Sequence, residues 1–206
     1  IKDALSYLKL VLNPHDDVAL RRVINTPPRG IGKGVMDALE RVDTSAPDLG
    51  APPLLAGLDM IAAANSLWAK LDAAVTRGGV SSRQAAPLAT FRDMLLGVTA
   101  AAESDPASRV LGLLLDRSGY LRDLREDRSE ESDARIENLM ELVSAARQYE
   151  AGEVDPTLAS FVDRLALLSD VDKPEGSQAA QALLMTMHSA KGLEFEYYPA
   201  EQMGKA

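Results

Sequence analysis

Asn25-Thr-Pro-Pro-Arg-Gly-Ile-Gly-Lys-Gly34 is a turn rich in glycine and proline within a chain that otherwise has regular apolar patterning. Apolar residues with the three-and-four spacing of a buried helix face lie on both sides of it, at residues 20–24 and 35–39. This arrangement predicts a helix, a tight hairpin turn and a second helix.

A helix, a Gly-x-Gly hairpin and a second helix form a known motif that binds the DNA backbone. Gly30 and Gly32 have no side chains to shield their amides, so successive N–H groups can point at one phosphate near the start of a helix. Arg29 and Lys33 would add positive charge. Ile31 is expected to pack inward and hold the turn.

Two other interpretations of this turn compete with phosphate contact. A tight connection between helices that needs glycine for its backbone dihedral angles is slightly favoured by these residues alone. A nucleotide-binding P-loop is excluded, because that motif needs a glycine at position 27 and Ser or Thr at position 34, where the chain has Pro27 and Gly34.

Helical periodicity continues through most of the chain. Apolar residues recur at three- and four-residue intervals near residues 5–12, 91–98, 136–143 and 158–165. We therefore predict a mainly α fold, a helical bundle that contains the helix-hairpin-helix-like element.

Three of the helix starts are marked by local signals. Asp105-Pro106 and Asp155-Pro156 each place a capping carboxylate before a proline suited to the first helical turn. Ser132-Asp133 precedes the stripe that begins at Ile136. Helices are expected to begin at these points.

The pattern changes near residue 182, where a short apolar run is followed by a turn and a second apolar run. We predict a short C-terminal β segment there. Hydroxyls, an imidazole and a lysine next to a glycine-containing turn can bind phosphate or sugar groups, and Glu194 could accept a ribose hydroxyl proton. An ordinary strand-to-helix turn explains these residues at least as well.

Composition limits the kinds of function. The chain has 206 residues and a net charge of −9, so any contact with nucleic acid must be local. Residues 1–41 are the better place for it, with seven Lys and Arg against five Asp and Glu. The absence of cysteine and the two distant histidines leave little for a metal site. We expect a cytoplasmic bacterial protein fragment with no membrane partner.

Several segments, in order, resemble the UvrD/PcrA/Rep family of superfamily 1 DNA helicases. These are Ile1–Leu8, Asn13–Asp17, Ile24–Gly32, Ser118–Tyr120, Arg135–Leu139 and Thr186–Phe195. Residues 42–108 resemble the family only as a generic helical stretch, and Pro199 stands where the family continues a buried strand.

The resemblance implies two parts. Residues 1–181 would be a 2B-like subdomain that touches duplex DNA, with residues 1–12 as its junction helix, and residues 182–206 would be part of a 2A-like domain with motif V. Its implied DNA-binding residues are Thr26, Arg29, Gly30, Ile31, Gly32 and Lys33. Thr186, His188, Ser189 and Lys191 would face single-stranded DNA, and Glu194 would face the nucleotide.

The resemblance also implies a role and partners. The parent helicase would use ATP and Mg²⁺, which this fragment alone has no residues to bind and cleave. Its partners would be duplex DNA or a single-strand/duplex junction, the remaining helicase domains and repair proteins. The alternative is a helical protein-interaction module that regulates the motor without touching DNA. An independent hydrolase is disfavoured, since no nucleophile–base pair or metal cluster is apparent.

Overall fold

Every regular element in the described part of the chain is an α-helix. The computed structural model describes residues 1–44 and 63–171, with side chains up to residue 167. Its helices are α1 Lys2–Leu12, α2 Asp17–Val23, α3 Lys33–Glu40, α5 Leu67–Thr76, α6 Ser82–Ala102, α7 Ala107–Arg117, α8 Tyr120–Asp127, α9 Glu130–Gly152 and α10 Leu158–Val171. The prediction of a mainly α fold is confirmed.

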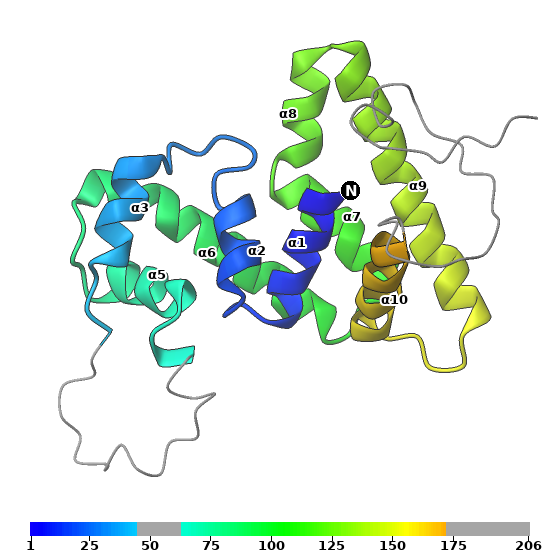
Figure 1. The fold of residues 1–206 in the computed structure, drawn as a ribbon, viewed down its shortest axis with the longest axis horizontal. Helices are drawn as coiled ribbons and strands as arrows, with labels where there is room; N and C mark the ends of the chain where they lie inside the picture. The colour runs from blue at the N-terminus through cyan, green and yellow to red at the C-terminus, as the bar shows by residue number, and fades with distance from the viewer. Residues whose placement is uncertain (45–62, 172–206) are drawn as a thin grey trace, which may run out of the picture. The chain divides into compact units, whose positions relative to one another are not determined.

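The first helix, α1, is the centre of the packing within residues 1–171 (Figure 1). It packs against α2, α6, α7 and α10, and it buries Tyr7, Leu8 and Leu10 completely. On one side α8 and α9 form an antiparallel pair that packs on α7, and on the other α3 packs on α5, which packs on α6 (Figure 1). The loop between α2 and α3 is thus supported by helices from distant parts of the sequence.

Two helices start at residues other than those predicted. α9 begins at Glu130, because the hydroxyl of Ser129 accepts a hydrogen bond from the amide of Ser132 at 3.1 Å. α10 begins at Leu158, because the hydroxyl of Thr157 accepts from the Ser160 amide at 3.1 Å. Each cap is a hydroxyl near the predicted position, which is a common choice at a helix start.

The start of α7 next to Pro106 is confirmed, but the predicted cap is wrong. Asp105 forms an ion pair with Arg109 at 3.4 Å instead of capping the helix. The amide of Ser108 donates to a carboxylate oxygen of Glu150 on α9 at 2.6 Å. A distant residue therefore satisfies the free amide, which a search for local capping signals could not detect.

The predicted C-terminal segment lies outside the described residues. The chain divides into two compact units, residues 1–171 and 172–206, and the second contains no described residue. The β segment and the boundary at residues 181–182 stay predictions. Among the described residues, no helix is both long and apolar enough to cross a membrane.

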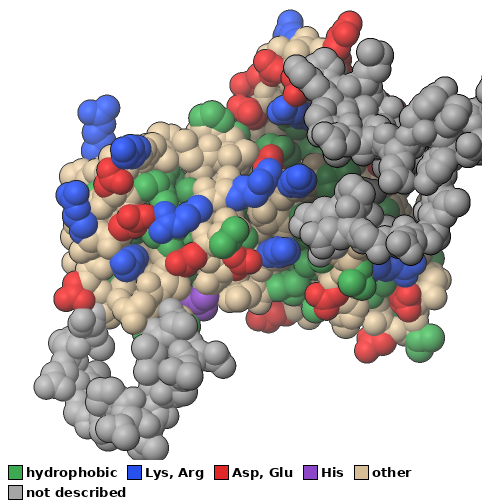
Figure 2. Space-filling view, viewed as in Figure 1, with side chains coloured by type: hydrophobic (Ala, Val, Ile, Leu, Met, Phe, Trp, Pro, Cys, Tyr) green, Lys and Arg blue, Asp and Glu red, His purple; other side chains and the backbone are tan. Residues whose placement is uncertain are grey.

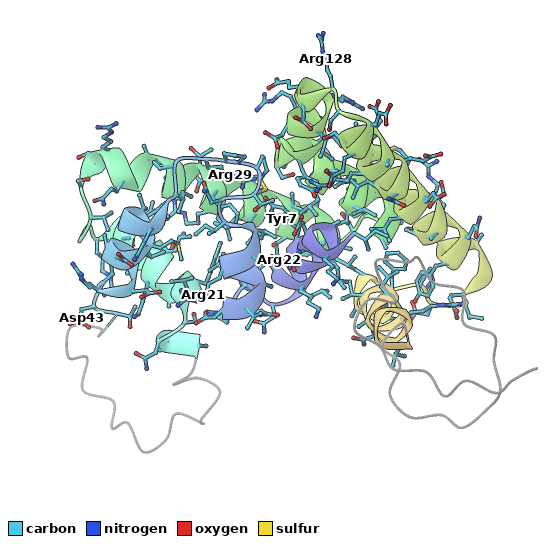
Figure 3. The ribbon with its side chains drawn as sticks, turned by 45° about the horizontal axis from the view of Figure 1, so that its top comes forward. Tyr7, Arg21, Arg22, Arg29, Asp43 and Arg128 are labelled. Carbon is cyan, nitrogen blue, oxygen red and sulfur yellow. The ribbon has the colours of Figure 1, made fainter. Side chains whose placement is uncertain are left out.

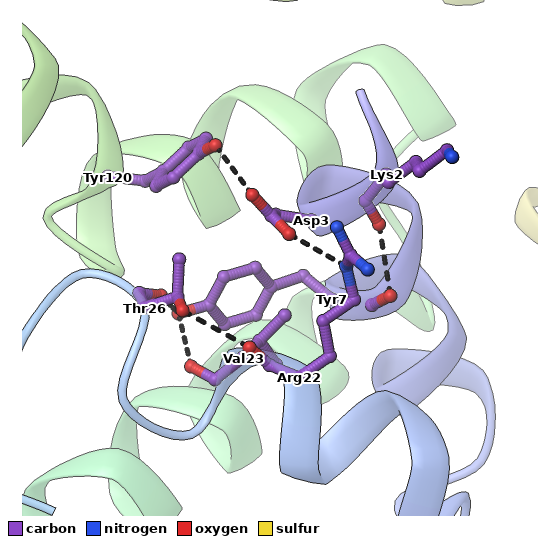
Figure 4. A network of polar contacts seen from close by, with 8 residues as sticks. Lys2, Asp3, Tyr7, Arg22, Val23, Thr26 and Tyr120 are labelled. Atoms are coloured by element: carbon purple, nitrogen blue, oxygen red, sulfur yellow. Dashed lines mark hydrogen bonds and ion pairs between the residues drawn. The ribbon is translucent and has the colours of Figure 1, made fainter.

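Two tyrosines connect the first helix to its neighbours (Figure 4). The carboxylate of Asp3 on α1 accepts hydrogen bonds from Arg22 of α2 at 2.7 Å and from the hydroxyl of Tyr120 on α8 at 2.9 Å. The hydroxyl of Tyr7 donates to the backbone oxygen of Thr26 at 2.5 Å. These bonds join α1, α2, α8 and the loop after α2.

The free energy of unfolding is expected to fall as the pH rises from 10 to 12. Burial raises the pKa of Tyr7 to about 12, and burial together with the bond to Asp3 raises the pKa of Tyr120 to about 12. The folded chain therefore keeps these protons after the unfolded chain has released them. This stabilisation is complete below pH 10 and is lost as the pH rises through 12, by up to about 1.4 kcal/mol per pH unit for Tyr7.

Urea unfolding at a series of pH values measures this dependence. The Tyr120→Phe variant should lose less stability between pH 10 and pH 12 than the wild type, because one of the two titrating groups is gone. Parallel losses in the two proteins would contradict the account.

Candidate nucleic-acid interface

The loop between α2 and α3, residues 24–32, is folded by its own asparagine. The side-chain oxygen of Asn25 accepts hydrogen bonds from the amides of Arg29 at 2.8 Å and Ile31 at 3.1 Å. An asparagine that bonds to later amides in this way stabilises a turn. Ile31 is 2% exposed, so the prediction that it packs inward is confirmed.

Arg29 points into the molecule and fixes the loop to the helices beneath it (Figure 3). Its guanidinium donates to one hydroxyl and four backbone oxygens: Tyr7 Oη at 2.6 Å, Ser118 O at 2.8 Å, Val23 O and Pro27 O at 3.1 Å, and Ile24 O at 3.3 Å. It also lies 5.4 Å from the ring centre of Phe91 on α6. One planar group thus links α1, α6 and the end of α7 to the loop.

This placement differs from the phosphate contact expected for Arg29. Its Nη1 and Nη2 groups already donate to acceptors within the chain, so its geometry is that of a residue that positions the loop. A direct contact between Arg29 and DNA stays a prediction that these bonds do not support.

The two central glycines differ in whether the turn requires them. Gly30 has φ +77°, a left-handed conformation that other residues rarely adopt, so a turn explains its identity. Gly32 has φ −82° and ψ −173°, which any residue can adopt. A Cβ atom added at Gly32 would meet nothing within 4 Å. Neither backbone conformation nor local packing therefore requires glycine at position 32.

The start of α3 presents free donors beside this glycine. Among the described residues, no acceptor bonds to the amides of Gly32, Lys33 or Gly34, while the amides of Val35 and Met36 bond to the Gly32 carbonyl. The exposed start of a helix carries partial positive charge, and the exposed Lys33 side chain lies there too. Such a group of donors can bind an anion.

The remaining predicted loop residue is Thr26. It is half-buried, and its hydroxyl donates to the backbone oxygen of Arg22 at 3.1 Å. The loop therefore brings all six predicted residues into one short segment. Of these, Gly30, Gly32 and Lys33 have amides that bond to no acceptor in the described part of the chain.

The predicted motif V residues cannot be placed in the same way. Thr186, His188, Ser189, Lys191 and Glu194 all lie outside the described residues. Their roles toward single-stranded DNA and the nucleotide stay predictions.

Three residues that hold the loop were not predicted from the sequence: Tyr7, Asn25 and Ser118. All three lie within segments that carry the family resemblance, Ile1–Leu8, Ile24–Gly32 and Ser118–Tyr120. The structure explains why such distant segments occur together, because Arg29 bonds to both Tyr7 and Ser118. The family resemblance of these three segments was the feature of the sequence that could have identified them. It did not show that the Arg29 side chain points toward them.

Charge on the visible surface does not form one uniform patch. On the face shown in Figure 2, the side chains of Lys and Arg are interspersed with those of Asp and Glu. Any contact with a polyanion on this face must therefore depend on the local arrangement of donors.

Comparison with known proteins gives a consistent result. The family described as UvrD-like helicase C-terminal domain matches residues 1–49 and 90–198. Residues 50–89 lie outside this match and include all of α5. The match extends into residues 42–49 and 90–108, which the sequence resemblance had treated as generic.

Three relatives are similar over 95% of this chain. They are the ATP-dependent DNA helicase PcrA of Bacillus subtilis, 34% identical over 200 residues; PcrA of Staphylococcus epidermidis, 33% identical over 199; and DNA helicase II of Escherichia coli, 32% identical over 198. The chain spans 25%, 24% and 25% of their respective lengths. The chain belongs to the family of UvrD-like helicase C-terminal domains, of the UvrD/PcrA type of superfamily 1.

Proposed function

We propose that this chain is part of an ATP-dependent 3′–5′ DNA helicase that acts in DNA repair or replication. Residues 1–181 would be its 2B-like subdomain, which contacts duplex DNA beside a single-strand junction and regulates the motor. Family membership and the helicase names of three relatives support the proposal.

The observation that carries the DNA contact is the glycine at position 32. Open space surrounds its missing side chain, and the backbone there is unstrained for any residue. Glycine is a favoured residue at a helix N-cap, and it also lets a ligand approach the backbone closely. Three free amides and Lys33 at this position fit a phosphate oxygen.

The contact should be weak and sensitive to salt. One loop neutralises few phosphates, and for about three contacts the affinity falls by about 40-fold between 50 and 200 mM salt. The net charge of −9 adds no general attraction for DNA. We propose that Arg29 contributes by holding the loop in shape.

The phosphates of ATP and the Mg²⁺ ion would be bound by other domains of the parent helicase, since the loop lacks a P-loop pattern. Thr186, His188, Ser189 and Lys191 are proposed to face single-stranded DNA in the parent, and Glu194 the ATP ribose. The remaining helicase domains and repair proteins are its proposed partners.

A protein-interaction module is the second candidate, and one groove favours it. This groove, of about 600 Å³, lies between α6, α7 and α9. Arg109, Arg117 and Arg147 line it together with Asp105 and Asp116, a mixed set of charges suited to a protein surface. This candidate predicts partner binding that is independent of DNA and unaffected by changes at Gly32.

Fluorescence anisotropy with a labelled hairpin duplex that carries a single-stranded tail tests the DNA contact. Gly32→Val should remove most of the binding at low salt, because its side chain covers the free amides. Gly152→Val is the matched control, since a Cβ there also meets nothing within 4 Å and the site is exposed at the end of α9. Equal binding by Gly32→Val and the wild type would favour the protein-interaction module.

The Arg29→Lys variant separates the charge of Arg29 from its shape. Lysine keeps the positive charge but cannot reach all five acceptors, so the free energy of unfolding should fall by about 1–3 kcal/mol. Duplex affinity should fall with it, because the loop loses its support. Urea unfolding and anisotropy measure the two effects.

Arg83→Lys is the control, since it makes the same exchange at an exposed arginine at the start of α6, outside the loop. Its stability and duplex affinity should stay close to the wild type. An Arg29→Lys variant as stable and as tightly bound to duplex as the wild type would refute the positioning role.

A further inference from the structure

We infer that Arg122, Arg125 and Arg128 form a second contact with the phosphate backbone of duplex DNA, continuous with the loop at residues 24–32. This α8 arginine stripe rests on the proposed function, because it extends the contact that the loop begins. The stripe runs along α8 to the tip of the α8–α9 pair.

The three arginines are exposed and available. Among the described residues, none of them has an ion-pair or hydrogen-bond partner, whereas six other arginines form ion pairs. Their guanidinium groups are thus available to a ligand, as is that of the exposed Arg83 at the start of α6 within the described residues. An external anion would supply the missing partner.

The stripe is separated from the acidic residues of the same helix. At about 100° per residue, Arg122 and Arg125 lie on one flank of the exposed face, and Asp123 and Glu126 lie toward the other. Asp127 is occupied by hydrogen bonds from the hydroxyls of Ser129 and Ser132. Arg125 is therefore the arginine farther from the acidic flank, while Arg122 lies about 40° from Glu126 at the boundary between the two flanks.

The tip residue has a backbone conformation that is unfavourable for arginine. Arg128 has φ +50° and ψ 25°, the left-handed region that favours glycine and asparagine. Its side chain projects away from the helices (Figure 3). Because glycine or asparagine would fit this backbone better, the side chain of Arg128 is the best explanation for its presence.

The stripe begins beside the loop. A Cβ atom at Gly119, the residue before α8, would lie 3.3 Å from the guanidinium of Arg122 and 3.9 Å from the ring of Pro27. The adjacent Ser118 accepts a hydrogen bond from Arg29 at 2.8 Å. Arg122 therefore lies next to the loop, and the two surfaces can contact one ligand together.

The length of the stripe fits a duplex strand. Six residues of helix rise by about 9 Å, and a duplex strand presents one phosphate per about 3.4 Å along its axis. Three arginines can therefore meet about three successive phosphates. Because the spacing depends on backbone charge, the contact should not depend on base sequence.

The test is anisotropy of the full 206-residue chain with the tailed hairpin duplex across a salt series. The double variant Arg122→Gln/Arg125→Gln should weaken binding and lower the slope of log affinity against log salt by about 0.9 for each phosphate that is no longer neutralised. Arg83→Gln, which removes an equally exposed arginine at the start of α6, should leave the slope unchanged.

Arg128→Asn separates binding from folding. Because asparagine tolerates the left-handed backbone, the thermal midpoint of this variant should equal or exceed that of the wild type. Its duplex affinity at 50 mM salt should fall about three-fold or more, since one phosphate is no longer neutralised. A loss of affinity that accompanies a loss of stability would overturn the assignment for this residue.

The outcomes distinguish this inference from the proposed function. Stripe variants that bind duplex like the wild type, while Gly32→Val weakens binding, would overturn the stripe and leave the loop contact intact. A wild type that does not bind duplex would overturn both. Unlabelled duplex and polyglutamate can each be added as competitors of the labelled duplex. If polyglutamate competes as effectively as the duplex, the stripe binds acidic proteins and the DNA contact is overturned.

Discussion

The guanidinium of Arg29 is the interaction on which the loop depends. A planar group with five N–H donors can satisfy several acceptors at fixed angles, and here it bonds to Tyr7, to Ser118 and to three carbonyls around the turn. The guanidinium thereby satisfies the carbonyls of Ile24 and Pro27 and adds a second partner to the Val23 carbonyl, which also accepts from the Thr26 amide. The burial of a charge is thereby offset by hydrogen bonds, and the loop acquires one conformation.

Some residues of the loop are explained by folding, and Gly32 is better explained by ligand binding. Gly30 adopts a left-handed conformation and Ile31 fills the core, so both are explained by folding. Gly32 is explained by neither conformation nor packing, and it begins the helix with the free amides. The α8 stripe begins next to the same loop, so a fixed loop would also fix how the stripe meets a duplex.

Sequence periodicity predicted most of the helices, because a buried stripe repeats with the helical period wherever a helix packs on a core. It did not predict α5 or α8. The burial of Ile31 could be predicted from its place between the two glycines of the turn. The orientation of the Arg29 side chain could not be predicted, because its partners Tyr7 on α1 and Ser118 after α7 are far away in sequence. The hydrogen bond from the Ser108 amide, at the start of α7, to Glu150 of α9 was missed for the same reason. The motif V residues lie outside the described part of the chain and stay predictions.

The most direct test of the central claim is an amide NMR titration of the chain labelled with ¹⁵N-glycine. On addition of the tailed hairpin duplex, the amide resonances of Gly32 and Gly34 should shift in proportion to binding, because a phosphate accepts their free N–H groups. Those of Gly112 and Gly152, on α7 and α9, should stay in place. Saturable binding without shifts at Gly32 and Gly34 would contradict the account.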